Sequence, residues 1–167
     1  MAKECKLRWD TPSLGLSPPK MNEKRAAEAG LSDEEQRAVN RVSGEMNARV
    51  LGELRAMYVE VTGDKAGADT LEPQALGQEI LAKSPEKEVQ KVFARLSRER
   101  AGLAPPSGGK GGSAAERLMR LMTTLGDAYE RELGDAIGAE HAHALRARNN
   151  GWDNRSRSSF GCPDDGE

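Results

Sequence analysis

Two histidines, His141 and His143, are the side chains of this chain best suited to proton transfer or metal binding near neutral pH. They are two positions apart in a segment of helical periodicity, so they point to different sides of the helix. Glu140 and His143 form Glu-x-x-His, a spacing used on one helix of carboxylate di-iron bundles, but a second copy is missing. We therefore expect His141 to be a partly buried helix-end residue, with a metal site of Glu140, His141 and His143 as the weaker alternative.

The two cysteines, Cys5 and Cys162, lie near opposite ends of the chain in polar, irregular segments. Buried structural cysteines usually occur in apolar runs, so this setting favours a disulfide bond between the ends. Trp9, Trp152 and Phe160 lie in the same two segments, and we expect them to pack together as a cap. A disulfide would indicate an oxidising compartment, periplasmic or secreted, which we favour over the alternative of a cytoplasmic protein with two free thiols. If both thiols were reduced and close to the histidines, Cys5, His141, His143 and Cys162 would be an alternative ligand set for zinc.

Motifs of the common enzyme classes are missing from the sequence. It contains no nucleophile elbow, no phosphate loop and no pair of carboxylates within a recognisable catalytic motif. The methionines follow helical spacing, which is typical of core residues. The net charge is −2 and the arginines are spread along the chain, so no attraction to nucleic acid is expected. We expect a non-enzymatic protein without a cofactor.

Long helices must position these residues, because no alternating strand pattern occurs and only 4% of the residues are aromatic. Ser32 and Glu35 form a capping box at the start of the first long helix, with Leu31 as its hydrophobic staple. Apolar residues then recur in steps of three and four as far as Gly63, a typical helix terminator. The pattern predicts a helix over residues 32–62.

Two short helices are predicted next, one from Pro73 to the residues before Ser84, and one capped by Ser84 that runs from Pro85 to Arg100. Residues 107–113 have the composition of a flexible linker, and we expect that they replace a longer native loop. Ser113 opens a second long helix over residues 113–148. Gly44 and Gly52 lie within the first long helix, and Gly126, Gly134 and Gly138 lie within the second. Close helix approach or a kink would explain these glycines, and a coding bias toward G and C is an equal alternative.

The resulting fold class is all-α: an elongated antiparallel helical bundle with two long and two short helices, whose irregular terminal segments join at one end. Residues 1–31 form the irregular N-terminal arm, with a short helical piece at 21–29. Residues 32–148 form the bundle. Residues 149–167 form a C-terminal cap and acidic tail.

The segment from Leu31 to Gln36, Leu-Ser-Asp-Glu-Glu-Gln, resembles the Leu-Thr-x-x-Gln motif of periplasmic helical-hairpin proteins, a family of envelope-stress chaperones and heavy-metal sensors. Serine replaces threonine here and the glutamine lies one place late. The resemblance covers six residues and implies an all-helical extracytoplasmic sensor or chaperone, and no functional residue is carried over from it.

We expect a non-enzymatic extracytoplasmic interaction module, sensor-like or chaperone-like, whose partner is another protein. Nucleic acid is not expected as a partner, membrane attachment is expected only through an N-terminal anchor missing from this sequence, and a homodimer is an open alternative. The alternatives are a metal-binding protein that uses His141, His143 and nearby acids, and a structural or engineered helical scaffold.

Overall fold

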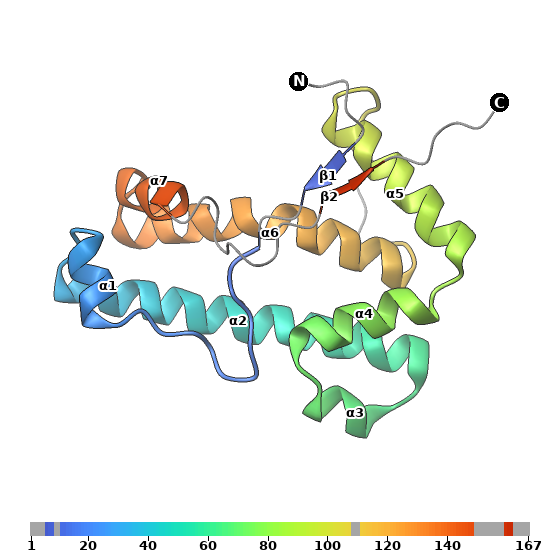
Figure 1. Cartoon of the computed structure of the whole chain (residues 1–167), viewed down its shortest axis with the longest axis horizontal. Helices are drawn as coiled ribbons and strands as arrows, with labels where there is room; N and C mark the ends of the chain where they lie inside the picture. The colour runs from blue at the N-terminus through green and yellow to red at the C-terminus, as the bar shows by residue number, and fades with distance from the viewer. Residues whose placement is uncertain (1–5, 9–10, 108–110, 149–158, 162–167) are drawn as a thin grey trace.

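The computed structural model describes residues 6–8, 11–107, 111–148 and 159–161. Helices dominate this part of the chain, so the prediction of an all-α fold is confirmed (Figure 1). The elements, in chain order, are β1 (Lys6–Arg8), α1 (Glu23–Glu28), α2 (Asp33–Thr62), α3 (Lys65–Thr70), α4 (Pro73–Lys83), α5 (Glu86–Arg100), α6 (Ala114–Ile137), α7 (Ala139–Arg148) and β2 (Ser159–Gly161).

Helix α2 begins and ends where its local sequence predicts. The Ser32 hydroxyl accepts a hydrogen bond from the Glu35 N–H at 3.2 Å, and the Glu35 carboxylate accepts the Ser32 N–H at 2.8 Å. This reciprocal capping box satisfies two donors that the first helical turn would otherwise leave unpaired. At the other end Gly63 adopts φ +74°, and its N–H donates to the Val59 carbonyl.

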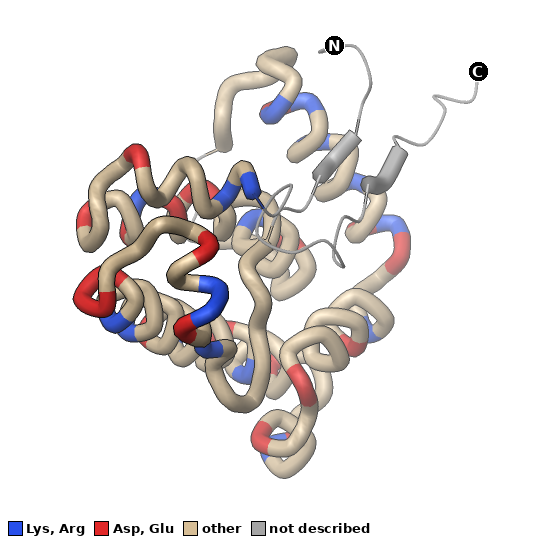
Figure 2. The backbone as a smooth tube through the Cα atoms, turned by 60° about the vertical axis from the view of Figure 1, so that its left-hand side comes forward, with Lys and Arg blue, Asp and Glu red and all other residues tan. Residues whose placement is uncertain are grey.

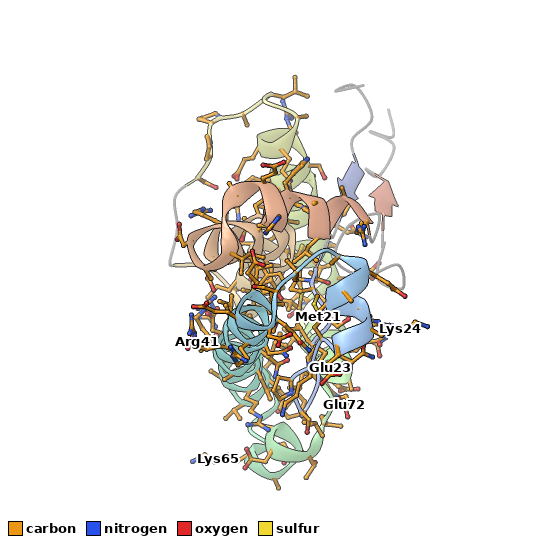
Figure 3. The ribbon with its side chains drawn as sticks, turned by 90° about the vertical axis from the view of Figure 1, so that its left-hand side faces the viewer. Met21, Glu23, Lys24, Arg41, Lys65 and Glu72 are labelled. Atoms are coloured by element: carbon orange, nitrogen blue, oxygen red, sulfur yellow. The ribbon has the colours of Figure 1, made fainter. Side chains whose placement is uncertain are left out.

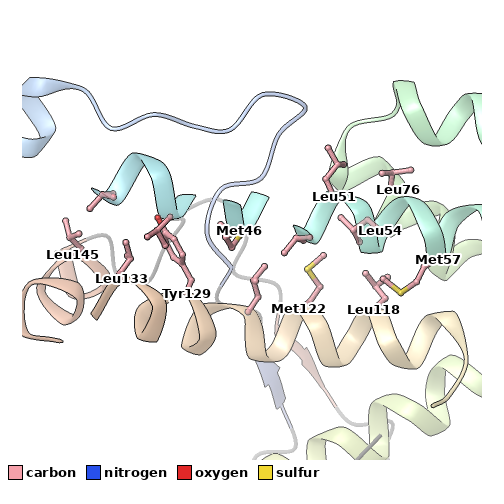
Figure 4. Close-up of a cluster of buried hydrophobic side chains, with 14 of the residues drawn as sticks. Met46, Leu51, Leu54, Met57, Leu76, Leu118, Met122, Tyr129, Leu133 and Leu145 are labelled. Carbon is pink, nitrogen blue, oxygen red and sulfur yellow. The ribbon is translucent and has the colours of Figure 1, made fainter. Parts of the chain in front are cut away.

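The centre of the molecule is the antiparallel packing of α2 against α6, with α4 lying across both helices (Figure 1). Met46, Leu54, Leu76, Leu118 and Leu133 are among its most deeply buried side chains (Figure 4). They come from three helices, so burial of this shared apolar surface stabilises the arrangement of the elements as well as each helix. A second, smaller apolar cluster joins α5 to α6.

The expected second long helix over residues 113–148 is in fact two helices. Gly138 adopts φ +87°, which ends α6, and α7 then folds back along α6. Arg146 consequently pairs with Glu130 at 2.6 Å, whereas a continuous helix would separate these residues by about 24 Å along its axis. The prediction of one uninterrupted helix was wrong, because the apolar side of α7 buries Ala142 and Leu145 in the core only after this reversal.

Two further local predictions differ from the structure. Ser84 does not cap α5: its hydroxyl donates back to the Ile80 carbonyl at 2.7 Å, and Pro85 occupies the cap position. The acidic stretch after α2 contains α3, which the sequence did not predict, and the Asp64 carboxylate caps it by accepting the Gly67 N–H at 2.9 Å. The bundle therefore has more short helices than the two that were predicted.

The two ends of the chain meet in a small antiparallel ladder, in which Lys6 faces Gly161, Leu7 faces Phe160 and Arg8 faces Ser159. The pairing of the terminal segments agrees with the prediction, but its position does not. The ladder lies beside α5 (Figure 1), whereas the expected place was the end of the bundle that contains His141. Cys5, Cys162, Trp9 and Trp152 lie outside the described residues.

Basic and acidic residues alternate over the helices in Figure 2, with both signs on the same elements. Salt bridges such as Arg49 to Glu132, 2.6 Å apart, connect α2 with α6. Among the described residues, no helix combines the length and the apolar character needed to cross a membrane.

Candidate functional site: the arm-binding face of α2

A stripe of uncharged polar residues runs along α2 beside its apolar stripe. It consists of Gln36, Asn40, Ser43 and Asn47, which follow one another in steps of four, three and four. This spacing keeps them on one side of the helix. Three of them bind residues 11–22 of the N-terminal segment, and from here on the term arm refers to these twelve residues only. We call the surface formed by Gln36, Asn40 and Asn47 the arm-binding face.

Asn47 holds the arm at Gly15 through both of that residue's main-chain polar groups. Its Oδ1 accepts the Gly15 N–H at 3.0 Å, and its Nδ2 donates to the Gly15 carbonyl at 2.9 Å. Asn47 is itself buried. Because a buried main-chain group without a hydrogen bond is costly, this side chain provides what a neighbouring β-strand would otherwise provide.

Asn40 repeats the same arrangement two helical turns earlier. Its Oδ1 accepts the Met21 N–H at 2.7 Å, and its Nδ2 donates to the Met21 carbonyl at 3.2 Å. Gln36 Nε2 donates to the same carbonyl at 2.9 Å. Figure 3 shows Met21 beside α2, just before the start of α1. The arm therefore runs antiparallel to α2, and side-chain amides hold it at two points.

Apolar contacts accompany these hydrogen bonds. Leu14 and Met21, which are half-buried, pack against the main core, and Thr11 is buried. Between the two points the arm turns away from α2, and Leu16 is 42% exposed. The arm is thus anchored near Gly15 and near Met21, with an exposed bulge over residues 16–20 between the anchors.

The remaining member of the polar stripe, Ser43, connects α2 to α6. Its Oγ lies 2.5 Å from the hydroxyl oxygen of Tyr129 inside the core. Burial raises the pKa of Tyr129, so its hydroxyl stays protonated near neutral pH. This contact positions the helix that carries the arm-binding face.

The structure places His141 and His143 in separate ion pairs. His141 Nδ1 lies 2.6 Å from the Glu35 carboxylate in the capping box of α2, and its side chain is 45% exposed. Hydrogen bonds from the main chain and hydroxyl of Ser32, and then from His141, lower the pKa of Glu35. The prediction of a partly buried His141 at a helix end was wrong: this residue is exposed and lies in the first turn of α7, because the reversal at Gly138 turns it toward α2.

His143 Nδ1 lies 3.0 Å from the Glu130 carboxylate, which also pairs with Arg146. The Arg146 guanidinium is the main cause of the lowered pKa of Glu130. Within the described residues, no group of three or more histidine, cysteine or acidic side chains is arranged to hold a metal ion. The weak candidate set of Glu140, His141 and His143 is therefore not brought together, and the two histidines connect α7 to different helices.

A partly buried charge network joins α5 to α6 and extends into the segment predicted to be a linker. Arg120 makes a two-pronged contact with Glu99, at 3.1 and 3.3 Å, and also contacts Glu116. Ser107 donates to Glu99 at 2.5 Å and accepts from Arg120 at 2.6 Å. The hydrogen bonds from Arg120 are the largest influence on Glu99 and lower its pKa to about 2.

Sequence reasoning did not find the arm-binding face. Single-sequence patterns emphasise charge, histidine and cysteine, whereas Gln36, Asn40 and Asn47 are uncharged residues that also occur widely on solvated helices. The signal that could have found them is their helical spacing directly beside the apolar stripe of Val39, Val42, Met46 and Val50.

No protein-family model, curated protein or solved structure matches this chain. The arm-binding face and the paired chain ends are therefore the two features from which a function can be argued.

Proposed function

We propose that this protein is a non-enzymatic helical interaction module of an oxidising, extracytoplasmic compartment. The observation that carries the proposal is the register of the terminal ladder, in which Lys6 faces Gly161. Cys5 directly precedes Lys6, and Cys162 directly follows Gly161. If the same antiparallel register continued one residue outward from Lys6 and Gly161, it would pair Cys5 with Cys162.

Such a pair suits a disulfide bond. Residues directly opposite each other in antiparallel strands have Cα atoms about 4.5 to 5.5 Å apart, and disulfides span about 4.4 to 6.8 Å between Cα atoms. A ladder of three residues in two strands is marginally stable on its own. A covalent bond at its end would hold the pairing, and the chain-entropy model assigns about 4 to 5 kcal/mol to a loop of this length.

The compartment follows from the chemistry of the bond. Structural disulfides persist in the periplasm and outside cells, whereas thiols in the cytosol are kept reduced. The contacts of the ionisable groups support the non-enzymatic part of the proposal. His141, His143 and Arg120 are bound to carboxylates of other helices, which is a structural use of these side chains. A sensor-like or chaperone-like activity would then reside in a surface, for which the arm-binding face is the candidate.

Intact-mass measurement of unreduced protein, after alkylation of free thiols, tests the proposal. We expect a single species that is two hydrogens lighter than the reduced chain and carries no alkyl groups. The matched controls are Cys5→Ser and Cys162→Ser, each of which should take up one alkyl group. Two alkylated thiols in protein prepared from an oxidising compartment would overturn the proposal.

A further inference from the structure

We infer that the arm-binding face of α2 is a binding site for an extended peptide segment of a partner protein, and that the N-terminal arm is its built-in competitor. The partner segment would present an apolar residue followed by glycine, as Leu14 and Gly15 do in the arm. This inference rests on the proposed function, because it names the surface and the partner chemistry of the interaction module.

The arm-binding face recognises main-chain groups. The Asn40 and Asn47 amides each bind both the N–H and the carbonyl of a single arm residue. Main-chain hydrogen bonds of this kind provide affinity for an extended segment, while the adjacent side chains provide specificity. Another segment of the same backbone conformation would therefore satisfy the same four groups.

The two anchor points select particular residues of a bound segment. Leu14 and Met21 pack against the core on either side of the exposed bulge, so apolar side chains are required at the two anchor points. A Cβ atom at Gly15 would lie only 2.9 Å from the Ser17 carbonyl oxygen. The tight turn after the first anchor therefore favours glycine, and the preferred partner sequence is apolar-glycine at that anchor.

The attachment of the arm to α2 allows its displacement. The arm is anchored at two separate points, and residues 16–20 between them include two prolines and the exposed Leu16. A tethered competitor acts at a local concentration of the order of millimolar, so a partner segment binds weakly while the arm is in place. Apparent affinity should rise in proportion to the fraction of molecules in which the arm has left the site.

The test uses the full chain and, as the probe, a fluorescently labelled synthetic peptide of residues 11–17, which carries the first anchor alone. In Gly15→Ala the new methyl group disfavours the docked arm, and we expect the peptide to bind this variant about tenfold or more tightly than it binds the wild type, in fluorescence anisotropy. Gly52→Ala is the matched control, since a Cβ there meets nothing within 4 Å, and it should bind like the wild type. Adding Asn47→Leu to Gly15→Ala should abolish the gain.

Circular dichroism establishes that each variant is folded. If Gly15→Ala is unfolded, Leu14→Ser releases the same anchor without altering α2. Equal peptide binding by folded released variants and by Gly52→Ala would overturn the inference, as would binding that survives Asn47→Leu. Concentration-dependent association of the released variant with the wild type, whose arm is intact, in competition with the peptide would assign the site to the arm of a second copy, and would overturn a separate partner.

The outcomes also separate this inference from the proposed function. Peptide binding by a protein with two free thiols would support the site and overturn the extracytoplasmic assignment. A disulfide-bonded protein whose released variants do not bind the peptide would overturn the site alone.

Discussion

The hydroxyl oxygen of Tyr129 lies 2.5 Å from Ser43 Oγ, within the core between α6 and α2. Polar groups at such a position are stabilising only while they are paired, because an unpaired hydroxyl in the core loses its hydrogen bonds to water without replacement. The contact therefore favours one alignment of the two central helices. That alignment also sets the position of Asn40 and Asn47, which lie on the same stripe of α2 as Ser43.

Removal of the Tyr129 hydroxyl should destabilise the protein. We expect Tyr129→Phe to lower the free energy of unfolding by about 1 kcal/mol, because Ser43 loses the oxygen to which it is bonded. Urea denaturation of Tyr129→Phe, Ser43→Ala and the double variant measures the coupling. Additive single effects would show that the contact contributes nothing of its own.

The reversal between α6 and α7 should depend on glycine. At φ +87°, Gly138 has a backbone conformation that residues with a Cβ adopt only at a cost, so Gly138→Ala should lower the free energy of unfolding by about 1 to 3 kcal/mol. Gly52→Ala, within α2, should instead raise it by up to about 1 kcal/mol. Thermal unfolding of both variants checks the prediction, which a neutral Gly138→Ala would contradict.

The charge network of α5 and α6 should make stability depend on pH in the acid range. The Glu99 side chain is 8% exposed, and Arg120 holds its pKa at about 2, below the ordinary value of 4.5. A lowered pKa in the folded state means that the stabilisation is fully present above about pH 4.5 and is lost as the pH falls toward 2.

Arg120→Met tests this dependence of stability on pH, because it removes the guanidinium that pairs with Glu99. It should raise the pKa of Glu99, and its free energy of unfolding should fall less steeply between pH 4.5 and 2 than that of the wild type. Denaturation at several pH values and the carboxyl titration of Glu99 by NMR measure both effects. An unchanged Glu99 titration in the variant would assign the pKa shift to another group.

The two anchors of the arm should be separable by amide hydrogen exchange. Asn47→Leu removes the acceptor of the Gly15 N–H, so protection of this amide should be lost while the Met21 amide keeps its bond to Asn40. Asn40→Leu should have the converse effect. Loss of protection at both amides in either variant would show that the arm leaves as one unit.

Local sequence patterns were sufficient to predict the helical class and the bounds of α2. The capping box of Ser32 and Glu35 and the terminating Gly63 act through neighbouring residues, so their effect is visible in a short stretch of sequence. The predicted starts of α4 and of α5 near Pro73 and Pro85 are correct for the same reason. The sequence also predicted that the terminal segments meet, from the two cysteines and the aromatic residues near them.

The point at which the chain reverses and the partners of the polar residues depend on packing between distant segments, which local patterns do not show. Gly138 is compatible with a continued helix or with a break, and the burial of Ala142 and Leu145 against the core selects the break. The partner of Asn47 is a main-chain group of Gly15, whose identity no side-chain pattern encodes. Local signals act within a few residues, whereas these choices depend on surfaces that adjoin only after the chain has folded.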